Sequence, residues 1–129
     1  MATGLSSTVA NGFLNALCRA TNYTAPTAFY IKLHVGDPGS AGASNAATET
    51  TRKAVTFGSA ASGGAISNTV AVTWTTVAGT EDFTHYSIWD ASTAGNFLGS
   101  GTITANAVVA GDDFTIAVGD IDLALSTAA

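Results

Sequence analysis

Residues 83–104 constrain the fold most strongly, because they hold two runs of alternating side chains around a turn of small residues. Successive side chains of a strand point to opposite faces, so this alternation predicts a β-hairpin. The first run places Phe83, His85, Ser87 and Trp89 on one side and Thr84, Tyr86 and Ile88 on the other. Gly95 and Asn96 tolerate the positive φ that a tight turn needs. We expect this hairpin to form the middle of a β-sheet.

Further segments show the same alternation and are separated by turn signals such as the GDPG at 36–39. They are residues 29–35, 52–57, 66–74, 114–118 and 121–125. Short strands at a spacing of about 8–12 residues are typical of a β-sandwich or a jelly-roll-like antiparallel barrel. The sequence of 129 residues has the length of one domain. We therefore expect a mainly β fold in a single domain over residues 1–129, with the β part at 28–125.

One amphipathic helix is predicted at the N-terminal end, over residues 5–20. Its apolar face is formed by Leu5, Val9, Phe13, Ala16, Leu17 and Ala20. Ser6 or Ser7 can cap its start by accepting a hydrogen bond from a free backbone amide. Cys18 lies near the apolar side and is expected to be a buried small side chain. The helix is predicted to cover an end or a face of the sheet, or to anchor the chain on a neighbour.

Residues 40–51 contain no large apolar side chain. Such a segment cannot build a core of its own. We expect either a long exposed loop or an arm that a partner orders.

Charged residues make up only 10% of the chain, and the net charge is −5. The four basic residues are scattered, so nucleic acid is not an expected partner. No apolar run approaches the roughly 20 residues that span a bilayer, and the first residues do not resemble a signal peptide. The low charge also fits a surface that is covered by partners or by copies of the same chain.

No set of residues predicts catalysis, a cofactor or a metal site. His34 and His85 lie on separate strands and are interpreted as ordinary strand residues, because a zinc site would need further ligands at matching spacing. The single Cys18 excludes an internal disulfide. The aspartates, for example Asp90, Asp112 and Asp113, are interpreted as turn residues that bond nearby backbone amides. We do not expect an enzyme.

Four stretches, at 4–39, 54–74, 83–101 and 110–125, together resemble a family of small virion structural proteins. The family comes from tailed phages, especially those of actinobacteria, and its members are commonly labelled tail fibre or minor tail proteins. The resemblance implies a non-enzymatic particle component, made in the host bacterial cytoplasm and located in the virion. The features shared with the family are strand and turn patterns, and the resemblance assigns no functional residue to this chain.

Three roles are open for such a component. A fibre needs length, yet the sequence has no heptads and no internal repeat. We therefore favour a capsid decoration protein that stabilises the head surface, with a tail fibre or minor tail subunit as the alternative. A carbohydrate-binding adhesin module is the third role, because exposed aromatic rings can stack on sugars.

The expected partners are the phage major capsid protein or tail proteins. Copies of the chain itself are expected as well, in a homo-oligomer such as a trimer. The candidate interface residues are Phe13, Leu17, Tyr30, Tyr86 and Trp89.

Overall fold

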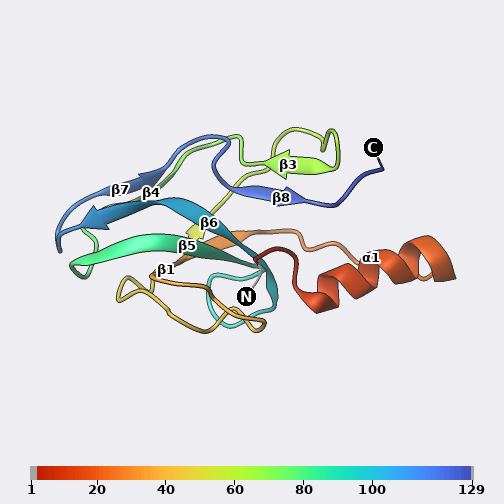
Figure 1. Ribbon diagram of the computed structural model, residues 1–129, viewed down its shortest axis with the longest axis horizontal. Helices are drawn as coiled ribbons and strands as arrows, with labels where there is room; N and C mark the ends of the chain where they lie inside the picture. The colour runs from red at the N-terminus through yellow and green to blue at the C-terminus, as the bar shows by residue number, and fades with distance from the viewer. Residues whose placement is uncertain (1–2, 129) are drawn as a thin grey trace.

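The computed structural model describes residues 3–128, and it shows a β body from which one helix projects (Figure 1). The first layer of the body is an antiparallel four-stranded sheet in which β5 is flanked by β1 and β6. The strand order and bounds are β2 (Lys53–Ala54), β1 (Tyr30–His34), β5 (Glu81–Trp89) and β6 (Phe97–Val108). The predicted hairpin is thus confirmed as the antiparallel pair β5–β6, and its first strand is an inner strand of the sheet.

The second layer consists of two short antiparallel pairs that follow one another along the same two chain segments. They are β3 (Ala65–Ser67) with β8 (Asp122–Ala124), and β4 (Val72–Trp74) with β7 (Phe114–Ile116). Residues 66–74, predicted as one strand, are therefore split between β3 and β4. The two layers stay open and, within residues 3–128, do not close into a barrel.

The break between β3 and β4 is organised by the side chain of Asn68, which is 1% exposed. Its Nδ2 donates to the carbonyls of Val70 (2.9 Å) and Ala117 (3.2 Å). Its Oδ1 accepts from the amides of Gly119 and Ile121, both at 3.0 Å. One side-chain amide therefore bonds four backbone groups and connects the bend to the turn between β7 and β8.

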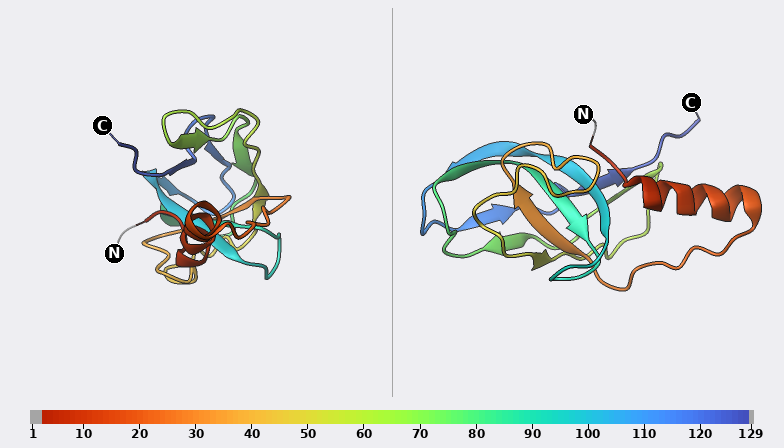
Figure 2. Two further views of the ribbon diagram at one scale, coloured as in Figure 1. Left: turned by 90° about the vertical axis from the view of Figure 1, so that its right-hand side faces the viewer. Right: turned by 90° about the horizontal axis from the view of Figure 1, so that it is seen from below.

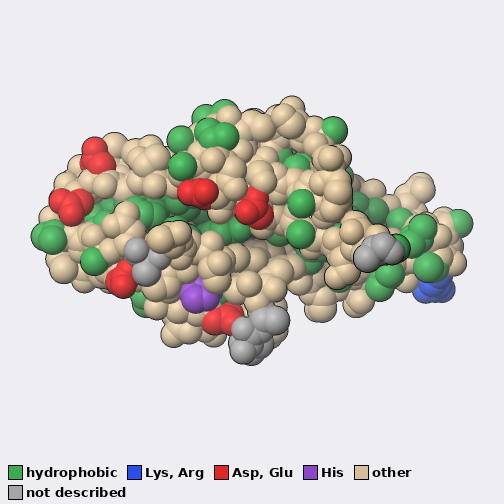
Figure 3. All heavy atoms as spheres, turned by 45° about the horizontal axis from the view of Figure 1, so that its top comes forward, with side chains coloured by type: hydrophobic (Ala, Val, Ile, Leu, Met, Phe, Trp, Pro, Cys, Tyr) green, Lys and Arg blue, Asp and Glu red, His purple; other side chains and the backbone are tan. Residues whose placement is uncertain are grey.

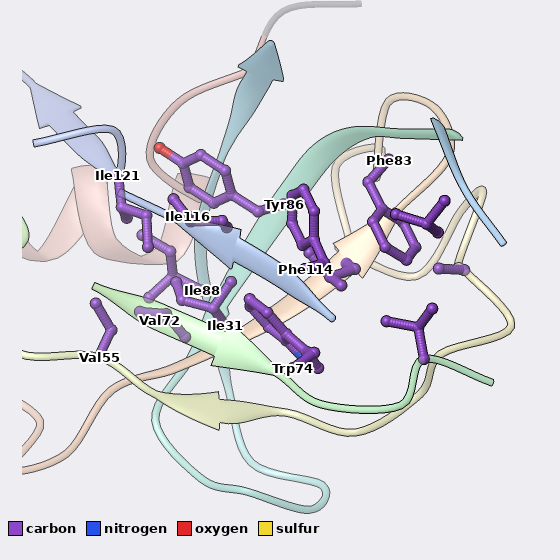
Figure 4. Close-up of a cluster of buried hydrophobic side chains, with 14 of the residues drawn as sticks. Ile31, Val55, Val72, Trp74, Phe83, Tyr86, Ile88, Phe114, Ile116 and Ile121 are labelled. Atoms are coloured by element: carbon purple, nitrogen blue, oxygen red, sulfur yellow. The ribbon is translucent and has the colours of Figure 1, made fainter. Parts of the chain in front are cut away.

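The core lies between the two layers, and the close-up shows its side chains converging from both (Figure 4). Members from the sheet and from the second layer are Ile31, Leu33, Phe83, Tyr86, Ile88, Val72, Trp74, Phe114, Ile116 and Ile121. Phe83 and Phe114 meet edge to face across the layers, with ring centroids 4.9 Å apart. The mainly β fold class with one N-terminal helix is confirmed.

A β-bulge changes the side to which Phe83 points. The register between β5 and β6 shifts between Phe83 and His85, where extra residues of β6 stand opposite Thr84. Phe83 is completely buried, while Trp89 is half-buried. The prediction that these two residues share a side is therefore wrong, because a bulge interrupts the strict alternation of side chains.

The segment at 40–51 is held by the chain itself. It forms no strand or helix, and most of its side chains are exposed, as expected of a loop. The amide of Val35 donates to Asn45 (2.9 Å), and that of Ala47 donates to Leu33 (3.1 Å). The buried carboxylate of Glu49 accepts from the amide of Ala78 at 3.1 Å. These contacts tie the segment to the rest of the chain, and the alternative of an arm that a partner orders stays a prediction.

Helix α1 (Ser7–Arg19) begins at Ser6, whose hydroxyl accepts from the amide of Val9 at 3.2 Å. Only its first half is close to the body, and its second half extends beyond the sheets (Figure 2). Val9 is the buried residue of the helix, and Cys18 is exposed. The expectation that Cys18 is buried is wrong, because no element covers that end of the helix. Among the described residues, no helix combines the length and the apolar character needed to cross a membrane.

Replacement of Asn68 tests the role of its amide. We expect Asn68→Ala to lower the free energy of unfolding by roughly 2–4 kcal/mol, because it leaves the buried amide of Ile121 without its acceptor and removes the partly buried bonds to Val70 and Ala117. Chemical denaturation followed by tryptophan fluorescence measures the change. Asn22→Ala, at an exposed position, serves as the control. A loss below about 1 kcal/mol in Asn68→Ala would show that the bend forms without this side chain.

Replacement of Glu49 tests the order of residues 40–51. We expect Glu49→Ala to increase the rate of cleavage in this segment by a protease of broad specificity, because the carboxylate no longer holds the amides of Thr51 and Ala78. The wild-type segment is expected to resist cleavage in the isolated protein. Thr50→Ala, at a neighbouring exposed residue, should cleave like the wild type. Equal rates in all three proteins would contradict this account.

Candidate functional site

Tyr30 and Trp89 stand opposite each other on β1 and β5, on the face of the sheet that points away from the core. Both are half-buried. The guanidinium of Arg52 lies 4.1 Å from the centre of the Trp89 ring, and Phe97 packs beside that ring at a centroid distance of 5.6 Å. A sugar stacks on an open ring face. The cation therefore competes for the face of Trp89 that an adhesin would use.

Arg52 also holds the hairpin turn. Its Nη1 donates to the carbonyls of Ala91 (2.9 Å) and Ala94 (2.7 Å). The carboxylate of Asp90 accepts from the amide and the side chain of Asn96, at 2.7 and 2.8 Å. These hydrogen bonds, first that of the amide, lower the pKa of Asp90. Arg52 thus connects the ring of Trp89 to the hairpin turn at one end of the sheet.

A buried chain of hydrogen bonds connects Trp89 to the segment at 40–51. The Nδ1 of His34 donates to the carbonyl of Ser44 (2.8 Å), because a carbonyl can only accept. The Nε2 of His34 then accepts from the hydroxyl of Ser87 (2.7 Å), whose oxygen accepts from the indole of Trp89 (2.7 Å). A Ser–His pair of this kind is also found in nucleophilic catalysis. Here both side chains are 0% exposed, so no substrate reaches them.

The structure places Tyr86 in the core, although the sequence marks it as a candidate interface residue. It is 2% exposed. Its hydroxyl donates to the carbonyl of Asp122 and accepts from the amide of the same residue, both at 3.0 Å. Because its ring is buried and its hydroxyl is hydrogen-bonded within the chain, Tyr86 is not accessible to a partner.

Asp90, Asp112 and Asp113 lie in loops and accept hydrogen bonds from backbone amides, as predicted. Asp112 accepts from the amide of Val109 (2.9 Å), and Asp113 accepts from the amide of Thr76 (3.0 Å). Over residues 3–128, no three His, Cys, Asp or Glu side chains gather in a way that could hold a metal ion.

Phe13 and Leu17 lie on the projecting helix. Phe13 is half-buried and packs edge to face on Tyr23, with centroids 4.8 Å apart. Leu17 is 80% exposed and Leu14 is 58% exposed. Beside this helix runs a groove of about 260 Å³, which we call the helix groove. Apolar side chains from α1, β3 and β8 line it, chiefly Leu5, Phe13, Ile66, Leu123 and Leu125.

The structure thus groups four of the five candidate interface residues in two places. Tyr30 and Trp89 are neighbours on the sheet, and Phe13 and Leu17 share the helix. Sequence reasoning missed Leu14, because it falls outside the face assigned to the helix. It also missed the helix groove, since Ile66 and Leu123 become neighbours only through the pairing of β3 with β8.

The model of the family described as podophage GP4 fiber I protein gp80 matches residues 4–124. This chain belongs to that family. It is therefore a structural virion protein of the phage fibre type. The comparison with curated proteins finds no match. The resemblance to phage virion proteins is confirmed, and the family favours the fibre alternative over capsid decoration.

Acidification is expected to destabilise the fold through His34. Burial is the largest cause that lowers its pKa below the ordinary 6.5, so the unfolded chain binds the proton more readily than the folded chain. The stabilisation is complete above pH 6.5 and is lost as the pH falls through the lowered pKa of the folded chain. Protonation would also place two donors, from His34 and Trp89, on the oxygen of Ser87.

The measurement is the free energy of unfolding between about pH 5 and 7, where few carboxylates titrate. His34→Gln should flatten the pH dependence. The same slope in wild type and His34→Gln would contradict the assignment to this side chain.

Proposed function

We propose that this chain is a subunit of a bacteriophage tail fibre. The observation that carries the proposal is the fibre family, whose model matches almost the whole described chain, from residue 4 to residue 124. The alternative of a capsid decoration protein rests on composition and on the absence of repeats. Low charge and small size suit either position in a virion, so they do not favour the head.

The fold is consistent with a building unit. The β body is held together by its core and by buried hydrogen bonds, and the described residues contain no buried side-chain nitrogen or oxygen without a partner. Among the described residues, the most exposed large apolar side chain is Leu17 on the projecting helix, at 80%, and the next are Val109 and Val118 on the β body, at 60% and 59%. A chain of this size supplies length to a fibre only when it is joined to other chains. Tail proteins of the same phage and further copies of this chain are the partners that we propose.

A sugar-binding role receives less support. Tyr86 is in the core, and Arg52 covers a face of Trp89. Of these three aromatic residues, Tyr30 alone has a ring that is both partly exposed and not covered by a cation. A stacking site would need more open aromatic surface than this.

The location of the protein in the virion tests the proposal. We expect gold-labelled antibodies against the chain to bind at the tail, and quantitative mass spectrometry to find a copy number in the range of the other tail proteins. A copy number that scales with the major capsid protein, with label over the head, would establish decoration instead. Antibodies against the major capsid protein, used on the same particles, serve as the control.

A further inference from the structure

The loop that follows β1 lies over the face of the sheet that points away from the core. Residues 36–46, which we call the lid, fold back along β1 (Figure 1). Ala46 forms an antiparallel bridge with His34, and the amide of Val35 donates to the carbonyl of Asn45 at 2.9 Å. The lid therefore covers the outward side of β1 at His34.

The tip of the lid rests on an aromatic ring. Gly42 packs so closely on Phe97 that an added Cβ would overlap the ring. Phe97 in turn packs beside Trp89, with ring centroids 5.6 Å apart. A movement of the lid would uncover the side of Phe97 on which Gly42 now lies.

The side chain of His34 connects the lid to the sheet. It is completely buried, and its Nδ1 donates to the carbonyl of Ser44 in the lid at 2.8 Å. Its Nε2 accepts from the hydroxyl of Ser87 on β5 at 2.7 Å. A neutral ring fits both bonds, because one ring nitrogen carries a proton and the other carries a lone pair. The connection therefore depends on the charge of the ring.

A second proton on the ring of His34 conflicts with these bonds. A protonated Nε2 is a donor, and the oxygen of Ser87 already accepts from the indole of Trp89 at 2.7 Å. The hydroxyl hydrogen of Ser87 would lose its present acceptor, and the new charge would be enclosed away from water. Protonation therefore favours an arrangement in which water reaches the ring.

The surroundings of His34 also oppose a proton. Burial is the largest cause that lowers its pKa, and it outweighs the carbonyls of Ser44 and Asn45, which raise the pKa. Lys32 on the same strand and His85, directly opposite on β5, lower the pKa further. The carboxylates of the neighbouring segments bond to backbone amides instead: Asp37 to Gly39, Glu81 to Thr48 and Glu49, and Asp90 to Asn96. A charged ring would thus gain more from water than from its present neighbours.

The lid can move while the body stays packed. Within residues 36–46, all of which the structure describes, none belongs to the hydrophobic core. Glu81 holds the amides of Thr48 and Glu49 at 2.9 and 3.1 Å, so the segment after the lid keeps its anchor. Water is also near, because His85 is partly exposed and Figure 3 shows a histidine side chain at the surface of the body. Segments with few core contacts open at a lower free energy than the whole chain.

We propose that protonation of His34 releases the lid from the sheet while the β body stays folded. The release hydrates the charged ring and uncovers the side of Phe97 that faces Gly42. Acid thus changes the surface that this chain presents, from a loop of small and polar residues to an aromatic ring. The loss of stability described above concerns unfolding of the whole chain, whereas this inference concerns a local opening. It does not depend on the position of the protein in the virion.

Amide hydrogen exchange of the full chain tests the proposal. It is followed by NMR between about pH 5 and 7 and corrected for the intrinsic exchange rate at each pH. The open state binds the proton more readily, so the open fraction should rise up to about tenfold for each pH unit below about 6.5. We expect this rise at the amides of Val35 and Ser44, which bond to Asn45 and Pro38. The amide of Val77, which bonds to Asp112 in the body, should not show it.

Three variants separate charge from packing. His34→Gln removes the titrating group and should abolish the rise at Val35 and Ser44. Gly42→Ala forces the tip of the lid away from Phe97 and should increase exchange at every pH while the pH dependence remains. Ser40→Ala, at an exposed position of the lid, is the control and should behave like the wild type.

The wild type alone also gives a decisive measurement, should His34→Gln fail to fold. The NMR titration of the His34 ring is expected to have its midpoint at the pH where the rise in exchange levels off. A different midpoint, or exchange at Val35 and Ser44 that does not change with pH, would overturn the proposal. The same rise at Val77 would show that acid unfolds the whole chain, and a rise that persists in His34→Gln would assign the effect to another group. Either result would overturn it as well.

Discussion

The hydroxyl of Tyr86 sets how the two layers of the body align. Apolar packing between layers is not directional, so it fixes their separation better than their register. Tyr86 stands on the inner strand β5 and exchanges two hydrogen bonds with the backbone of Asp122 on β8. Gly101 is required beside it on β6, because an added Cβ would overlap the phenol. The position of β8 determines that of β3, and these two strands form the wall of the helix groove that faces α1. The hydrogen bonds of Tyr86 inside the core therefore fix the position of the helix groove on the surface.

The period-two pattern was sufficient to predict the strands and the hairpin, because it reflects burial on one face of a sheet. It failed wherever a single polar or irregular feature interrupts the period. Asn68 splits a predicted strand by bonding to a turn about 50 residues away, and no local pattern contains that partner. The bulge at Phe83 similarly depends on extra residues in β6.

The candidate surface was predicted only in part. The helical period identified an apolar face but assumed that the sheet would cover it, which led to the expectation of a buried Cys18. Whether a helix lies on a sheet or extends past it depends on the course of the chain that follows, here the segment at 21–29 that contains Tyr23 and Phe29. Tyr86 and Trp89 show the same limit. Both are large strand aromatics, and only the pairing of β5 decides that one faces the core and the other faces outward.

The bulge between Phe83 and His85 also bears on the behaviour of the protein at high concentration. Strand β6 is the longest strand and lies at the edge of its sheet, where free backbone groups can recruit other strands and cause aggregation. Residues 4–6 cover its beginning through hydrogen bonds of Ser6 to Leu98 and of Ser100 to Gly4. Further along, the bulge breaks the even spacing of the remaining groups and increases the local twist. A chain with only 10% charged residues has little colloidal repulsion, so an irregular backbone at this edge is a feature that disfavours the pairing of β6 with a strand of a neighbouring chain.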